Sequence, residues 1–523
     1  MKKLIAYTEK NYFIFCTALY LIMAIVLFPH YKYFVDPDGE SYTNIAVKYA
    51  NGNFKDAING FWSPMISWCI VPFLLVGLNK IIAAKVASVL IGFLSVFTFN
   101  ILSNFSIKNK RLKIAVTFTA TGLLLLYSLF DIAVDICLLA GLFFYFFLIF
   151  KDEYLQNVKQ AILLGVAAAF CYFSKYYFFP FFLLHFLVCI VFFHKNNDWK
   201  IKNAAVVFIS FFIFALPWIF FISQKYQIGL IYCTSGKIDI SLELNNWVRN
   251  INSSQHFFLF PSNSSATDFT EDVFYVQGKY VSFFDSKSTI LFEINHIKES
   301  LVAFWEIINQ FSVFVFTLLL ITAITVFQKT NDTHQKKNLK IFLLSMPVYC
   351  SGYWLMHGEY RYYFILNFLT IIFGCVFIEQ WILNNGFSRV FKIGLVSFFL
   401  ISFYLFPITL ALQLNNREKY VHEISMRLKN DFKLKGIVLG EGGNYDDTQY
   451  ACFATDLQNV IINPVHWNER ERLKNELQKN NINYYFYWHW KTDQSDSLKS
   501  FYNFKEITEG KIYGLQIFKI TPP

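Results

Sequence analysis

Three carboxylates lie within five residues near the start of this 523-residue chain, at Asp36, Asp38 and Glu40. They directly follow an apolar run long enough to cross a membrane, and an amphipathic stretch follows them. Ionisable side chains at a membrane are costly to place and are commonly functional. A carboxylate there has the chemistry of a general base that removes a proton from a hydroxyl group. Residues 33–42 are therefore the first candidate for a reactive site.

Asp38 is the strongest candidate for the base, because it stands at the start of the amphipathic stretch. The competing interpretation is that Asp38 only caps a helix beginning at Ser41, since Asp is a favoured N-cap residue. A cap needs one residue, so Asp36 and Glu40 count against capping as the whole explanation. For Asp38 alone both interpretations stay open. Asp36 and Asp38 are also candidate ligands of a divalent metal ion.

Two cations offer the complementary chemistry, Lys175 and Arg361. Positioned Lys or Arg groups stabilise the negative charge that develops on a phosphate leaving group. Lys175 can instead be an interfacial lysine that extends its ammonium into water, and Arg361 an interfacial anchor among tyrosines. Asp131 and Asp135 are four residues apart and are expected to share a helix face. Two like charges so placed need a cation or a hydrogen-bonding partner.

The composition indicates a membrane protein. Hydrophobic residues make up 55% of the chain and charged residues 16%, with a mean hydropathy of +0.39, whereas a soluble protein carries about 25% charged residues. Apolar runs of roughly 20 residues recur from residue 11 to residue 413, as in a polytopic helical protein. The net charge of +10 does not indicate nucleic acid as a partner, because Lys and Arg cluster in the loops between spans.

Charge placement predicts the orientation. Lysines before the first span place the N-terminus in the cytoplasm, which makes residues 30–80 an extracytoplasmic loop. Its apolar part, 61–79, is broken by Pro64 and Pro72 and is expected to lie along the interface. This pattern predicts about eleven spans in the cytoplasmic (inner) membrane, with a large extracytoplasmic loop at 223–300. The predicted spans lie near residues 11–29, 81–103, 113–130, 132–150, 160–174, 177–193, 203–222, 301–327, 341–356, 362–383 and 392–413.

The composition becomes polar towards the end of the chain. We expect residues 1–415 to form the transmembrane catalytic domain and residues 416–523 an extracytoplasmic α/β domain. Its predicted elements are strands at 437–439, 460–462, 482–487 and 513–520 and a helix at 467–479. Nine cysteines are present, mostly in apolar runs and without metal-ligand spacing. Cys233 and Cys452 are both predicted to face outward and can pair, although nothing in the sequence shows that they do.

These motifs, in this order, resemble the GT-C glycosyltransferases, in particular the branch that contains protein O-mannosyltransferases and the lipid A aminoarabinose transferase. The stretch Asp38-Gly39-Glu40-Ser41-Tyr42, continuing through Ile45-Ala46, is similar to that branch's D-E-x-x-Y-x-x-I-A pattern. It departs from the pattern at Gly39, where the family has its second acid. Further similar segments are Trp62-Ser63-Pro64 with Trp68, Asp135, Ser174-Lys175 and Glu359-Tyr360-Arg361-Tyr362.

The resemblance implies a GT-C fold and an inverting transfer of a sugar from a polyprenyl-phosphate donor to an acceptor hydroxyl outside the cytoplasm. Asp38 would be the general base, and Lys175 and Arg361 would hold the phosphate. The acceptor can be a lipid, a glycan or a protein. A divalent metal varies within this fold, so no cofactor is certain. The expected substrate-binding residues are Asp36, Glu40, Tyr42, Asp135, Lys175, Glu359, Arg361 and Tyr362.

Two other functions fit the same sequence. A transporter or flippase of lipid-linked sugars would use the acids and Lys175 as pathway charges, but it would place ionisable residues near mid-membrane and carry paired broken helices. A polysaccharide polymerase or ligase would depend on the loop 223–300, in which the sequence reveals no strong constellation.

Overall fold

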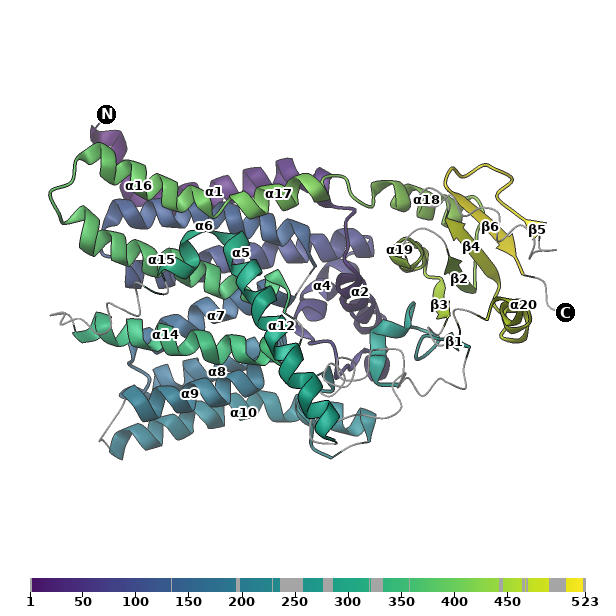
Figure 1. The fold of residues 1–523 in the computed structure, drawn as a ribbon, viewed down its shortest axis with the longest axis horizontal. Helices are drawn as coiled ribbons and strands as arrows, with labels where there is room; N and C mark the ends of the chain where they lie inside the picture. The colour runs from purple at the N-terminus through teal and green to yellow at the C-terminus, as the bar shows by residue number, and fades with distance from the viewer. Residues whose placement is uncertain are drawn as a thin grey trace.

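The computed structural model describes residues 2–132, 134–193, 198–227, 229–235, 257–275, 286–318, 320, 333–356, 358–441, 445–462, 466, 469–488 and 505–520. A body of long helices carries a smaller α/β unit at one end (Figure 1). Within the described ranges, seven helical segments are long and apolar enough to cross a membrane. The protein is thus a multi-pass helical membrane protein, and the total of eleven spans stays a prediction.

The helices of the body follow the predicted spans closely. In helix α7 and in the segment Tyr360–Leu383, 83% of the residues in an 18-residue apolar stretch are buried, so both lie at the centre of the body. Helix α7 packs on α5 and α8. The helices are α1 (Lys2–Tyr31), α5 (Lys80–Ser106), α6 (Lys110–Phe130), α7 (Val134–Lys151), α8 (Val158–Ser174), α9 (Phe178–Phe193), α10 (Asp198–Tyr226), α14 (Thr333–Trp354), α15 (Phe364–Ile378), α16 (Arg389–Ser402) and α17 (Leu405–Leu414).

The predicted continuous span at 301–327 is wrong. Helix α12 (Lys287–Phe311) starts earlier, ends at Phe311 and runs obliquely across its neighbours (Figure 1). The chain is extended at Ser312, with φ −170° and ψ 142°. The Ser312 hydroxyl oxygen accepts a hydrogen bond from the backbone N–H of Phe314 at 3.2 Å and lies 2.6 Å from Ser402 Oγ. Such side-chain bonding to a nearby backbone group competes with the helix and breaks it. Residues 319 and 321–327 of that prediction lie outside the described part.

Three short helices follow α1: α2 (Pro37–Ala50), α3 (Phe54–Ala57) and α4 (Met65–Leu75). Helix α4 has 11 residues, which at 1.5 Å per residue is about 16 Å, whereas a bilayer core is about 30 Å thick. Helix α4 alone is therefore too short to cross the membrane, and the placement of 61–79 along the interface stays a prediction. Helix α2 packs on α4 and lies between the body and the α/β unit (Figure 1).

Helix α2 begins four residues before Ser41, so the interpretation of Asp38 as its cap is wrong. The N-cap is Asp36, whose side chain accepts from Gly39 N at 3.3 Å. Pro37 stands at the first helical position, where its fixed φ and missing N–H cost nothing. The departure at Gly39 also has a physical reason. A Cβ at that position would lie 2.7 Å from Asp36 Oδ1 and 3.0 Å from Ile132 Cβ.

The α/β unit confirms the predicted strands and helix. The six-stranded sheet has the order β1-β3-β2-β4-β6-β5, with β2 parallel to both β3 and β4, and β6 antiparallel to β4. Strand β1 comes from the large loop and pairs antiparallel with β3, so the sheet is not built from residues 416–523 alone. Its elements are β1 (Phe258–Leu259), α18 (Lys419–Asn430), β2 (Ile437–Glu441), α19 (Tyr445–Thr455), β3 (Gln458–Ile462), α20 (Arg470–Lys479), β4 (Tyr484–Trp488), β5 (Lys505–Glu506) and β6 (Leu515–Lys519). Cys233 and Cys452 are both buried and are not joined by a disulfide bond.

Candidate active site

Arg361 lies at the centre of a cluster of carboxylates. It belongs to the single turn η2 (Tyr360–Tyr363) that leads into α15, and it is buried. Its Nη1 lies 3.3 Å from Asp36 Oδ2, and its Nη2 donates to Asp38 Oδ2. Its Nε lies 2.7 Å from Glu359 Oε2 and 3.9 Å from Asp135 Oδ2. One guanidinium thus connects the start of α2, the start of α7 and the turn before α15.

Lys175 is the second cation of the cluster. It follows the last residue of α8, and its ammonium lies 2.7 Å from Asp135 Oδ1. The same ammonium sits 3.4 Å from the centroid of the Tyr362 ring, within the range of a cation–π contact. Burial lowers the pKa of Lys175, and Asp135 works in the opposite direction. Because this side chain is only 15% exposed and is ion-paired, it does not extend into water as an interfacial lysine would.

Asp131 and Asp135 do not share a helix face, so that prediction is wrong. Asp131 is the extended C-cap of α6, while Asp135 lies in the first turn of α7. The break between them lets Ile132 N donate to Asp36 Oδ1 at 3.2 Å. Each carboxylate has its own partner: Asp131 accepts from Tyr360 Oη at 2.9 Å, and Asp135 pairs with Lys175. Burial, followed by the charge of Asp36, raises the pKa of Asp131 to about 7.

Asp38 is the carboxylate best placed to meet an incoming hydroxyl. Its side chain is 33% exposed, against 13% for Asp36 and 4% for Asp135. Desolvation by the surrounding protein raises the pKa of Asp38, the nearby charge of Asp36 raises it further, and Arg361 opposes both. A carboxylate with a raised pKa is a stronger base and is better matched to neutral pH.

Tyr42 and Glu40 complete the set of predicted residues on α2, but only one of them faces the cluster. Tyr42 is buried one turn after Asp38, and its ring centroid lies 5.0 Å from that of Trp62. Within the described part of the chain Glu40 makes no ion pair with either cation. Desolvation raises the pKa of Glu40 well above its ordinary value, and the largest contribution from a neighbouring charge comes from Asp268. The structure therefore does not bring Glu40 into the group around Arg361.

The carboxylates do not form a metal-binding set. In the ranges that the structure describes, no three His, Cys, Asp or Glu side chains are grouped so as to hold a metal ion. Asp36 is occupied by Gly39 N, Ile132 N and Arg361, and Asp38 pairs with Arg361. These carboxylates surround the guanidinium of Arg361 instead. No step of the proposed reaction is therefore assigned to a metal ion.

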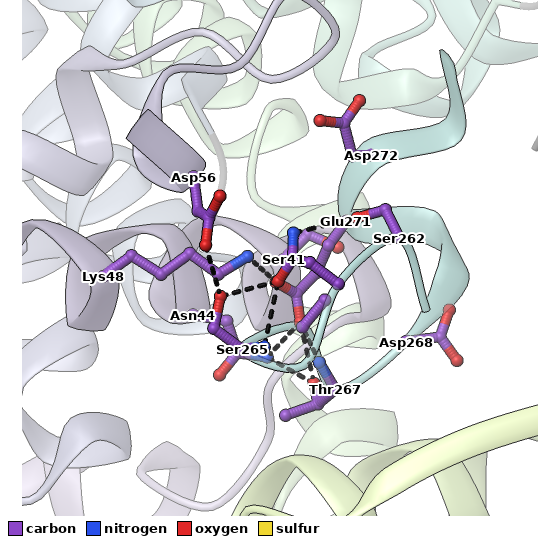
Figure 2. Close-up of polar contacts among 12 residues, drawn as sticks. Ser41, Asn44, Lys48, Asp56, Ser262, Ser265, Thr267, Asp268, Glu271 and Asp272 are labelled. Atoms are coloured by element: carbon purple, nitrogen blue, oxygen red, sulfur yellow. Dashed lines mark hydrogen bonds and ion pairs between the residues drawn. The ribbon is translucent and has the colours of Figure 1, made fainter. Parts of the chain in front are cut away.

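A second polar cluster occupies a different face of α2 (Figure 2). Its centre is Glu271, in the short helix η1 (Phe269–Tyr275) of the large loop. Glu271 Oε2 lies 2.7 Å from Lys48 Nζ, and both side chains are almost fully buried. Glu271 Oε1 accepts from Asn44 Nδ2 at 3.0 Å and from Thr267 N at 2.6 Å. The sequence interpretation missed this cluster, for which the only available signal was Asn44 and Lys48 one turn apart on α2.

Further bonds fasten the segment 257–275 to the body. Asn59 Nδ2 donates to Glu271 O at 2.6 Å, and Trp62 Nε1 donates to Thr270 O at 2.9 Å. Asp272 pairs with Lys225 at the end of α10 at 2.9 Å. Since β1 of the same segment pairs with β3, this segment links α2 and the membrane helices to the α/β unit.

No family model matches this sequence, and no curated protein sequence matches it either. Among solved structures, the oligosaccharyltransferase of Archaeoglobus fulgidus, in complex with Zn and sulfate, aligns with a TM-score of 0.54 and 12% identity over 91% of this chain and 68% of that chain. ArnT from Cupriavidus metallidurans, bound to undecaprenyl phosphate, aligns with a TM-score of 0.48 and 12% identity over 97% of this chain and 98% of that chain. The first likeness shows that this chain has the GT-C fold, which confirms the predicted fold class.

Proposed function

We propose that this protein is an integral-membrane glycosyltransferase that moves a sugar from a polyprenyl-phosphate donor to an acceptor hydroxyl on the extracytoplasmic side. The observation that carries this proposal is the meeting of an accessible carboxylate, Asp38, with two cations, Arg361 and Lys175. A base and a phosphate-binding pair are the two parts that such a transfer requires. The GT-C fold supports the same conclusion.

In the proposed reaction, Asp38 accepts the proton of the acceptor hydroxyl as its oxygen attacks the anomeric carbon. The new glycosidic bond forms on the face opposite the phosphate, so the configuration inverts. The bond between the anomeric carbon and the phosphate oxygen breaks, and its electron pair leaves with the phosphate. Arg361 and Lys175 stabilise that charge, because positioned cations act strongly where water is excluded.

The neighbouring residues take supporting roles in this proposal. Asp36 caps α2 and holds Arg361, and Asp135 holds Lys175. Among the carboxylates that pair with Arg361, Glu359 has the most exposed side chain, at 36%. It is therefore the carboxylate that a phosphate displaces most readily from Arg361. Tyr362 lies beneath the Lys175 ammonium, and Tyr42 lines the α2 side of the site.

The orientation belongs to the proposal as well. The protein is placed in the inner membrane of the cell, with its N-terminus in the cytoplasm. The loop 30–80, the loop 223–300 and residues 416–523 lie on the extracytoplasmic side. The basic loops between spans support this assignment through the positive-inside bias. All the residues of the Arg361 cluster then face the extracytoplasmic side, where a lipid-linked donor is available.

Cells that lack the protein test the function. We expect mass analysis of their glycolipids and glycoproteins to show the loss of one sugar-bearing species, which the wild-type gene restores. The Asp38→Asn variant should not restore it, although the exposed control Asp446→Asn, on α19, should. Full restoration by Asp38→Asn at equal protein level would rule out Asp38 as the base.

A further inference from the structure

A cavity of about 400 Å³ lies beside the second half of α2, away from the Arg361 cluster. Its other walls are residues 264–267 of the large loop and the chain around the start of β3. Figure 2 shows Asn44 and Lys48 of α2 close to Ser265 and Thr267 of the large loop, four of the residues that line the cavity. The volume is within the range of ordinary ligand sites, about 300–1,000 Å³. Nine of the eleven residues lining this cavity are polar, although their aliphatic parts supply much of its surface.

The charged groups of the wall are already neutralised by protein partners. Lys48 pairs with Glu271 at 2.7 Å. Asp456 pairs with Lys80 at 2.7 Å and with Lys429 at 3.0 Å. An anionic ligand would have to displace a buried carboxylate from Lys48, which is costly. The remaining polar wall consists of amides and hydroxyls, and it therefore favours a neutral ligand.

Several of these amides keep unused hydrogen-bonding capacity. In the described ranges, the Asn51 side chain, Asn53 Oδ1 and Gln458 Oε1 form no hydrogen bond, although Asn53 Nδ2 and Gln458 Nε2 do. Amide groups donate and accept side by side. The hydroxyls of Ser265 and Thr267 already bond within the protein, to Asn263 Oδ1 at 2.6 Å and to Glu271 Oε1 at 3.0 Å. A ligand rich in hydroxyl groups matches such a wall.

The position of the cavity limits what it can hold. At a rise of about 1.5 Å per residue, Asn44 is about 9 Å and Asn51 about 20 Å along α2 from Asp38. A hydroxyl that reacts at Asp38 therefore belongs to a different part of the acceptor from the group in the cavity. We propose that the cavity is an acceptor subsite for a neutral oligosaccharide, several sugar units away from the reacting hydroxyl. This inference rests on the proposed glycosyltransferase function, and it names the acceptor as a glycan.

Binding can be measured without the donor. The probes are oligosaccharides released by mild acid from the envelope of cells that make the protein, separated into neutral and acidic fractions, and a tryptic digest of the same envelope. Hydrogen exchange of the full-length protein in lipid nanodiscs is followed at residues 44–53, 262–268 and 456–459. We expect the neutral fraction to slow exchange in all three segments. Protection by only the acidic fraction, by only the peptides, or by no fraction overturns the proposal.

Two variants make the test specific. Asn51→Ala removes an exposed amide of the wall and should weaken binding of the neutral fraction about fivefold, the value of one hydrogen bond. Ser264→Trp should abolish the protection by filling the cavity. Asn430→Ala, an exposed amide at the end of α18, is the matched control and should bind as the wild type does. Binding of the neutral fraction by Asn51→Ala and Ser264→Trp as strong as that of the wild type would contradict the subsite.

The same measurement separates this proposal from the function on which it rests. Asp38→Asn should show full protection by the neutral fraction while transferring no sugar. A wild-type protein that transfers sugar but shows no protection overturns the subsite alone. A wild-type protein that is protected but transfers no sugar overturns the transferase function and, with it, the assignment of the cavity as an acceptor subsite.

Discussion

Asp38 and Arg361 are 323 positions apart in the chain, yet Arg361 Nη2 donates directly to Asp38 Oδ2. The proposed base is therefore held by one of the two cations that would bind the donor phosphate. A phosphate that attracts the guanidinium weakens this pair and leaves the carboxylate of Asp38 more basic. In the proposed reaction, donor binding and activation of the base would therefore be coupled through Arg361.

The planar fork of Arg361 should be essential. Arg361→Lys keeps the charge but cannot contact Asp36, Asp38 and Glu359 at once, because an ammonium lacks the fixed geometry of a guanidinium. We expect the rate of sugar transfer to fall roughly 10- to 100-fold in a single-turnover assay with a polyprenyl-phosphate sugar. This ratio corresponds to the loss of one hydrogen bond to a charged group. Arg389→Lys, at the exposed start of α16, is the matched control. Equal rates for the two variants would contradict the role of Arg361.

The pH profile should report Asp38. The base acts when it is deprotonated, so kcat/KM rises with pH through the pKa of Asp38, which lies above the ordinary value of about 4 because of burial and the charge of Asp36. Asp36→Asn removes that charge while keeping a good helix cap. The acidic limb should therefore move to lower pH in Asp36→Asn and stay in place in Asp446→Asn. A limb that does not move in Asp36→Asn excludes this coupling.

Asp135 should act through Lys175. Asp135→Asn keeps the shape of the side chain but removes the charge that lies 2.7 Å from the ammonium, so Lys175 loses its fixed position. We expect the KM for the donor to rise more than kcat falls, and Asp135→Glu to restore part of the loss. Titration of donor binding to the purified protein measures this directly. Unchanged donor affinity in Asp135→Asn would show that Lys175 is positioned by other groups.

The buried pair of Lys48 and Glu271 should be needed for stability. Removing one member of a buried ion pair leaves an uncompensated charge and costs about 3–5 kcal/mol. Lys48→Met should therefore lower the midpoint of thermal unfolding markedly, and Lys48→Met with Glu271→Met should recover part of the loss. The exposed pair of Lys511 and Glu509 is the control, since such pairs contribute about 0–1 kcal/mol. Similar midpoints for Lys48→Met and Lys511→Met would contradict the structural role of the buried pair.

The residues that meet in the site were largely predictable, because each one ends an apolar run on the same predicted side of the membrane. Asp38, Asp135, Lys175 and Arg361 do converge in the structure. Their chemical roles stay proposals. The fold class was also predictable, since apolar length and loop charge determine a polytopic arrangement with a polar domain at the end.

The errors have a common physical cause, which is that local breaks are set by distant partners. The sequence predicts the turn after α6, but not that α7 begins only at Val134, which separates Asp131 from Asp135. That turn is stabilised by Asp36, which is 96 positions away from Ile132. The break at Ser312 depends in the same way on Ser402, 90 positions away. Glu271 lies in a segment without periodicity, and its partner Lys48 is 223 positions away. Local sequence patterns extend over about one or two dozen residues, so they cannot predict contacts between residues this far apart in the chain.

The glycine at position 39 couples the packing of two distant parts of the chain. Its missing side chain makes room for the cap at Asp36 and for Ile132 at the turn between α6 and α7. An acid at this position would press against Ile132 Cβ at 3.0 Å, so either Ile132 or the turn that carries it would have to shift. A larger residue at position 39 would therefore be tolerated only together with a change in the turn that holds Ile132.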